Sequence, residues 1–138
     1  MISIEEFKEN VAKFGDLNPT PTPFGETPLR VALIEGYSIE YIRVLVEAGA
    51  GRPHGKWSDQ CALHWAAEGG QAAEVIRYLA EQGAPVNYCR YAQGTDGAYP
   101  LHCAYKSGNA ETISALLELG ADPEAHDCFG RRPEEYRK

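Results

Sequence analysis

The chain has 138 residues, of which 43% are hydrophobic and 10% aromatic, so a single domain with a substantial apolar core is expected. Its formal net charge of -7 argues against a nucleic-acid partner, because phosphate backbones are bound by clustered Lys and Arg side chains. The same charge disfavours an anionic membrane surface, and it fits either a basic partner protein or simple solubility.

The N-terminal residues contain neither the basic segment nor the apolar run of a signal peptide. No stretch reaches the roughly 18 consecutive apolar residues of a membrane span. We therefore expect a cytoplasmic protein, in which cysteines stay reduced. The four cysteines match no zinc-finger spacing and are expected as free thiols: Cys61, Cys89, Cys103 and Cys128.

Residues 3–14 have the pattern of an amphipathic helix. Ser3 and Glu6 have the spacing of a capping box, which satisfies the first backbone N–H groups of a helix. Apolar side chains then recur on one face, at Ile4, Phe7, Val11 and Phe14. We interpret residues 1–18, this helix and the short segment after it, as a degenerate half unit that covers one end of the structure that follows.

Two short blocks of sequence recur three times after this helix. The first block occupies residues 27–32, 61–66 and 99–104, and the second occupies 47–50, 81–84 and 118–122. Each first block suits a helix start, with proline in the first turn at Pro28 and Pro100. Each second block ends a second helix at a glycine suited to a left-handed cap. The second helices carry apolar stripes: Ile39, Ile42, Leu45 and Val46; Val75, Ile76 and Leu79; Ile113, Leu116 and Leu117.

These blocks resemble the ankyrin-repeat family, whose pattern is T-P-L-H-x-A on a period of about 33 residues. The motif leucines Leu29, Leu63 and Leu101 are 34 and 38 residues apart, because residues are inserted in the helix–helix turn and between positions 87 and 99. The resemblance implies an all-α solenoid of helix-turn-helix repeats with protruding β-turn fingers. It divides the chain into a degenerate half repeat at 1–18, repeats at 24–56, 57–94 and 95–127, and a truncated cap at 128–138.

No residue pattern indicates catalysis or a cofactor. P-loop, dinucleotide-binding and nucleophile-elbow motifs are absent from the sequence. His64 and His102 occupy the motif histidine position, where the resemblance implies that they tie neighbouring turns together. A zinc site formed by Cys89, Cys103, Cys128 and a finger histidine is a remote alternative, and with it a metal- or thiol-dependent enzyme. We expect no enzyme, no cofactor and no bound metal.

The resemblance implies that a partner binds the concave surface made by the finger tips and the first helix of each repeat. Large rings at variable finger positions, where polar residues are usual, indicate contact with a partner, since aromatic and Arg side chains often dominate binding energy. The alternative is that some rings fold back beneath the loops. Trp65 fits the groove and the core equally well. The predicted partner-binding residues are Phe24, Trp57 and Phe129, then Tyr88, Arg90 and Tyr91 in the insertion, and Glu35, Glu68 and Lys106 on the first helices.

We therefore predict a monomeric protein-binding module whose partner is another protein, such as a basic toxin or effector. The chain is similar to small bacterial ankyrin proteins, some of which are immunity proteins that neutralise a cognate toxin. The alternative is an intracellular adaptor or regulatory subunit.

Overall fold

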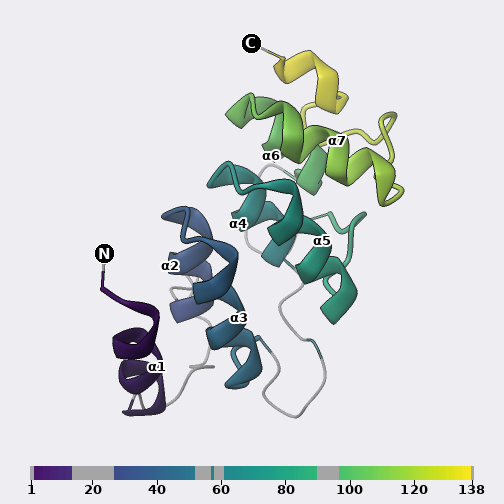
Figure 1. The fold of residues 1–138 in the computed structure, drawn as a ribbon. Helices are drawn as coiled ribbons and strands as arrows, with labels where there is room; N and C mark the ends of the chain where they lie inside the picture. Colours follow the sequence, from purple (N-terminus) through teal and green to yellow (C-terminus); the bar gives the residue numbers. More distant parts are fainter. Residues whose placement is uncertain (1, 14–26, 52–56, 58–60, 90–96, 138) are drawn as a thin grey trace.

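The computed structural model describes residues 2–13, 27–51, 57, 61–89 and 97–137. Within these residues the chain forms seven α-helices and one short 3₁₀ helix, with no strand. The helices stack along one direction into an all-α repeat solenoid (Figure 1). Their bounds are α1 Ile4–Lys13, α2 Pro28–Ile34, α3 Ile39–Glu47, α4 Ala62–Glu68, α5 Ala73–Gln82, α6 Pro100–Ser107, α7 Ala110–Glu118 and η1 Pro133–Tyr136.

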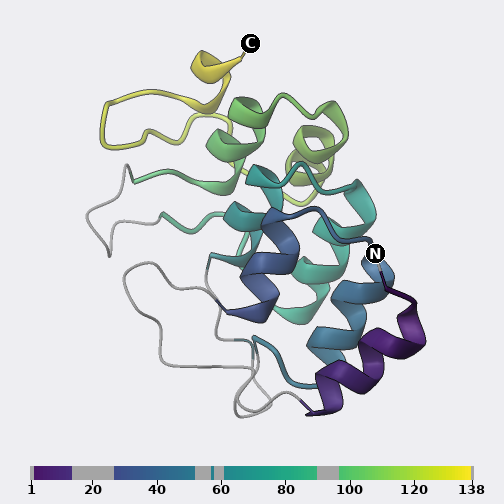
Figure 2. The same ribbon diagram turned by 90° about the vertical axis from the view of Figure 1, so that its left-hand side faces the viewer.

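The elements form two layers. The inner layer consists of α2, α4, α6 and η1, each in contact with the next. The outer layer consists of α1, α3, α5 and α7, which contact one another in the same order. Figure 2 shows α1 against the outer helix α3, and the loop between α7 and η1 projecting on the opposite side of the stack. The inner layer therefore places one helix per repeat side by side.

Short-range signals set the helix ends as the sequence predicts. Ser3 Oγ accepts the Glu6 N–H at 3.2 Å and Thr27 Oγ1 accepts the Arg30 N–H at 3.2 Å, so both start their helices as N-caps. The second helices end near glycines with positive φ, at 106° for Gly49, 115° for Gly83 and 98° for Gly120. Only glycine adopts this left-handed backbone without strain.

The core lies between the two layers and contains most of the predicted apolar stripe. The motif leucines Leu29, Leu63 and Leu101 are all completely buried. One stripe residue was predicted wrongly: Leu117 is 41% exposed, although Val46 at the equivalent position of α3 is fully buried. The reason is that α3 has α5 beside it, whereas no described outer helix follows α7.

Polar side chains link each repeat to its neighbour. Gln71 Nε2 donates to the Leu33 carbonyl at 3.1 Å, and Thr112 Oγ1 donates to the Gln71 carbonyl at 2.6 Å. Both side chains are buried, so these bonds satisfy groups that would otherwise lose their hydration without compensation. Asn109 Nδ2 adds a bond to the Gly70 carbonyl at 2.8 Å.

The first helix closes the outer layer at the N-terminal end. Phe7 meets Tyr37 and Tyr41 edge-on, with ring centroids 6.1 Å and 5.0 Å apart. Val11 of α1 is buried, and Tyr41 Oη donates to the Ile2 carbonyl at 2.6 Å. Among the described residues, no helix is long and apolar enough to span a membrane.

Candidate partner-binding surface

The two motif histidines connect successive inner turns, as the resemblance implied. His64 Nε2 lies 2.7 Å from the Ala98 carbonyl, and His102 Nε2 lies 2.8 Å from the Arg131 carbonyl. A carbonyl only accepts, so Nε2 carries the proton in both rings. His102 Nδ1 in turn accepts the Tyr99 N–H at 3.1 Å, which fixes the neutral tautomer. Both rings are fully buried, and their role is structural.

The exposed side of the inner helices and η1 forms a row that we call the inner face, made of Ile34, Glu68 and Lys106 with the partly exposed rings of Trp65 and Tyr136. Ile34, Glu68 and Lys106 occupy the same position in three successive repeats. Two of them meet a residue of the following repeat: Cys103 Sγ lies 3.7 Å from Glu68 Oε1, and Lys106 Nζ lies 4.5 Å from the Tyr136 ring centroid. The inner face is thus built from contacts between neighbouring repeats.

The chemistry of the inner face changes along the stack. Near α2, Ile34 is 45% exposed, and the Arg30 guanidinium lies 5.0 Å from the Trp65 ring centroid. The middle carries the carboxylate of Glu68, which is exposed. The C-terminal end carries a cation over an aromatic ring, at Lys106 and Tyr136. A ligand lying along this face would meet apolar, acidic and cationic groups in turn.

A tight turn built on Asp127 supports the C-terminal end. Asp127 Oδ1 accepts the N–H groups of Phe129 at 2.9 Å and Arg131 at 3.0 Å, and its other oxygen accepts the Tyr136 hydroxyl. Burial alone would raise the pKa of Asp127, but these hydrogen bonds hold it below its usual range. Burial and the bond to this carboxylate raise the pKa of Tyr136. The turn and η1 are thereby locked together.

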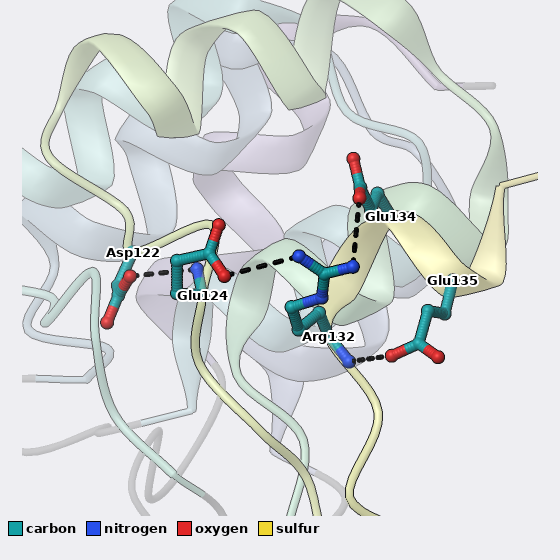
Figure 3. Close-up of polar contacts among 5 residues, drawn as sticks. All are labelled: Asp122, Glu124, Arg132, Glu134 and Glu135. Atoms are coloured by element: carbon teal, nitrogen blue, oxygen red, sulfur yellow. Dashed lines mark hydrogen bonds and ion pairs between the residues drawn. The ribbon is translucent and has the colours of Figure 1, made fainter.

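Arg132 gathers the carboxylates on the same end of the chain (Figure 3). Its guanidinium lies between Glu124 at 3.3 Å and Glu134 at 3.4 Å, and its backbone N–H donates to Glu135. Asp122 Oδ1 accepts the Glu124 N–H at 2.9 Å. These acidic groups are therefore held by donors within the chain.

The predicted ring residues lie in different environments. Trp57 is half-buried against the core, and a Cβ placed on Gly51 would lie only 3.0 Å from its Cη2 atom. This packing favours the alternative that the ring folds back onto the repeats. Tyr88 is half-buried and edge-on to His64 at 6.3 Å. Phe129 is 66% exposed at the tip of the turn. Partner contact by these three residues stays a prediction.

The predicted polar residues Glu35, Glu68 and Lys106 lie at or next to the C-terminal ends of the inner helices, with Glu35 and Glu68 exposed. They lie on successive elements of one layer rather than in one cluster. Phe24, Arg90 and Tyr91 fall outside the described residues, as do most of the expected finger positions. The protruding fingers and the repeat boundaries therefore stay predictions.

The sequence interpretation missed Tyr136 of the inner face and two nearby exposed cations that lie over aromatic rings, Arg131 and Arg137. Tyr136 lies three residues after Pro133, as Trp65 lies three after Ala62, so extending the repeat register into the cap would have found it. Arg137 has no such signal, because the ring beside it, Tyr105, belongs to α6, whereas the rings beside Arg131 are only two and five positions away in the sequence. Within the described part of the chain, no three His, Cys, Asp or Glu side chains form a group able to hold a metal ion, and the four cysteines are not disulfide-bonded.

Comparison with known proteins agrees with this architecture. A family model of ankyrin repeats, in three copies, matches residues 3–88 and 52–127. The chain is similar to a transient receptor potential cation channel subfamily A member 1 homolog of Caenorhabditis elegans, with 33% identity over 107 residues that cover 78% of this chain and 8% of that protein. It is similar to the human B-cell lymphoma 3 protein, with 36% identity over 109 residues, 78% of this chain and 24% of the relative.

A third relative is the palmitoyltransferase Hip14 of Drosophila melanogaster, with 34% identity over 93 residues that cover 67% of this chain and 14% of that protein. The chain thus spans about a quarter or less of the length of each of these relatives. The repeats, their stacking and the family match lead to one conclusion: the chain belongs to the ankyrin-repeat family, whose stacks generally serve as protein-interaction modules.

Proposed function

We propose that this chain binds a partner protein through the inner face of α2, α4 and α6. The observation that carries the proposal is a contrast between equivalent positions of the repeats. The core position is leucine three times, at Leu29, Leu63 and Leu101, all completely buried. The inner-face position is Ile34, Glu68 and Lys106, which have three different chemistries. Stacking needs uniform core residues, whereas recognition needs a varied surface.

An exposed apolar side chain adds support at one end of this face. Ile34 keeps 45% of its surface in water, beside the cation–aromatic pair of Arg30 and Trp65. Burying such a side chain against a partner removes apolar surface from water, and aromatic and Arg groups commonly anchor interfaces. The α2 end of the inner face is therefore the proposed apolar anchor.

Two narrower hypotheses concern the role of this chain and the kind of partner that it binds. In the first, this chain is a cytoplasmic, monomeric immunity protein for a basic toxin, a reading motivated by its net charge of -7 and its repeat architecture. In the second, it acts as an adaptor or regulatory module. The second is favoured by matches to small parts of larger proteins with unlike names, a channel homolog, a lymphoma protein and a palmitoyltransferase. None of those activities carries over to this chain.

The test compares two single substitutions with matched exposure and helix position. Ile34→Lys changes the inner face, and Leu117→Lys changes the outer helix α7; the two side chains are 45% and 41% exposed, and both lie in the last turn of their helices. Tagged wild type and both variants are used to capture partners from lysate, and the partner is then purified for titration calorimetry. Trp57→Ala is added to test the folded-back ring.

We expect Ile34→Lys to weaken binding of the purified partner about tenfold or more, the effect of burying a charge in place of an apolar anchor, and Leu117→Lys to leave it unchanged. The reverse pattern would move the site to the outer layer. Loss of binding in Trp57→Ala alone would move it to the loops beside Gly51 and Gly83. Rescue of cells from a co-expressed toxin by this chain would select the immunity hypothesis over the adaptor.

A further inference from the structure

Three cations at the C-terminal end of the inner layer lie over aromatic rings. We call this group the cation–aromatic patch. It combines side chains from α6, from the Asp127 turn and from η1 with the residue that follows it: Tyr105, Lys106, Phe129, Arg131, Tyr136 and Arg137.

The patch is reciprocal between α6 and η1. Lys106 of α6 lies 4.5 Å from the centroid of the Tyr136 ring, and Arg137 after η1 lies 5.4 Å from the centroid of the Tyr105 ring of α6. Arg131 lies 5.7 Å from the Tyr136 ring and 5.8 Å from the Phe129 ring. Each cation is thus held by a ring that belongs to another part of the chain or to the far side of a turn.

Stacking of this kind prepares a guanidinium for binding. A ring that covers one face of the group fixes its plane and restricts its rotamers, so less entropy is lost when a ligand binds. The N–H donors point outward along the edge of the guanidinium plane, where a carboxylate can accept two parallel hydrogen bonds. Arg131 and Arg137 are both exposed, so these edges are accessible.

The neighbouring carboxylates are engaged elsewhere. Glu124 and Glu134 hold the Arg132 guanidinium and Glu135 accepts its backbone N–H, as Figure 3 shows. Asp122 and Asp127 accept backbone N–H groups, and Asp127 also accepts the Tyr136 hydroxyl. By contrast, neither Arg131 nor Arg137 forms an ion pair with any carboxylate in the part of the chain that the structure describes.

We propose that the cation–aromatic patch binds an acidic segment of the partner protein, whose carboxylates accept hydrogen bonds from Arg131 and Arg137. This inference rests on the proposed function and deepens it, since the patch continues the inner face beyond Lys106. The whole chain carries a net charge of -7, so an acidic segment needs local cations such as Arg131 and Arg137 in order to bind. The remainder of the partner can still be basic.

The direct test uses a short peptide of alternating Glu and Ser residues and a control in which Gln replaces every Glu. Each is titrated into full-length protein at low ionic strength, and the Arg side-chain Nε–H signals are followed by NMR. We expect saturable shifts of the Arg131 and Arg137 signals with the Glu peptide alone, and weaker binding in about 300 mM salt, because salt screens exposed charges.

Two double variants with the same change in net charge separate the patch from general electrostatics. Arg131→Gln with Arg137→Gln removes the patch cations and is expected to weaken peptide binding about tenfold, the effect of two exposed charge pairs. Arg43→Gln with Arg77→Gln removes exposed outer-layer cations, of which Arg43 lies 5.2 Å from the Tyr78 ring centroid and Arg77 lies 2.7 Å from Glu118. This control is expected to change the affinity about twofold or less.

Several outcomes would overturn the inference. One is no saturable shift with the Glu peptide, and another is an equal loss of affinity in both double variants. A third is a lower melting temperature of the Arg131 and Arg137 double variant with unchanged peptide binding. The cation–aromatic contacts would then only stabilise the packing of η1 on α6. If an RNA oligonucleotide shifts the same Arg131 and Arg137 signals and binds more tightly than the Glu peptide, the patch is a phosphate-binding site instead.

The two proposals fail in distinguishable ways. If capture of the partner depends on Ile34 but survives removal of Arg131 and Arg137, the inner face stands and the acidic-segment inference is wrong. If the Glu peptide binds at the patch while Ile34→Lys leaves partner capture unchanged, the proposal that the inner face binds the partner is wrong. The patch is then the binding surface by itself.

Discussion

Replacing Gly69 with alanine tests the spacing of the inner helices. Gly69 follows α4, and its φ of -78° is ordinary for any residue, so backbone strain does not explain the glycine. A Cβ at this position would lie 2.1 Å from the Leu33 carbonyl oxygen and 2.9 Å from the Ile34 oxygen. Both are backbone atoms at the end of α2, which rotamer changes cannot move. We infer that Gly69 permits the close approach of α4 to α2.

The cost of Gly69→Ala follows from that clash. Overpacking that moves backbone costs about 3 kcal/mol, at the upper end of the usual range. Gly108→Ala is the matched control, because a Cβ there meets nothing within 4 Å while its φ of 76° is left-handed. Forcing alanine into that backbone costs only about 1 kcal/mol. The pair therefore separates steric contact from backbone strain.

Thermal unfolding followed by circular dichroism measures both variants. For a domain of this size 1 kcal/mol corresponds to about 4 °C, so we expect Tm to fall by about 12 °C in Gly69→Ala and about 4 °C in Gly108→Ala. Equal losses, or a larger loss in Gly108→Ala, would refute the reasoning that contact between α2 and α4 requires glycine.

Three further predictions concern the contacts between repeats. His102→Leu leaves the Arg131 carbonyl without its donor, and we expect the free energy of unfolding to fall by about 2 kcal/mol in urea denaturation; a neutral result would mean that water replaces the ring. The pKa of Asp127 is lower in the folded state than in the unfolded state, so its carboxylate stabilises the fold above roughly pH 4, the unfolded value. This contribution is lost as the pH falls through the lowered folded-state pKa. We therefore expect Tm to fall less steeply on acidification in Asp127→Asn than in the wild type, and parallel curves would contradict this. Asn87→Ala removes a bond of 2.9 Å to the Gly120 carbonyl, which should cost about 1 kcal/mol and speed hydrogen exchange in the turn after α7, whereas unchanged exchange would assign that turn's order to other contacts.

Much of the fold could be predicted from the sequence because its signals are local and repeated. Proline at the start of a helix, glycine after its end and apolar residues at helical spacing depend on neighbours within a few positions. Three copies of the pattern reinforce one another, and the motif leucines and histidines occupy equivalent places in the core. Stacking of like units then follows, since one helix pair cannot bury its apolar face alone.

The sequence alone determined the repeat architecture and the helix limits, and its resemblance to the ankyrin family implied the structural role of the motif histidines. Only the tertiary structure decided which side chains face a neighbour and which face water. Leu117 follows the same apolar pattern as Val46 and is nevertheless exposed, because burial depends on the element beside it. Arg137 meets the Tyr105 ring across 32 positions of sequence. Such contacts arise from the packing of one repeat on the next, and no local periodicity encodes them.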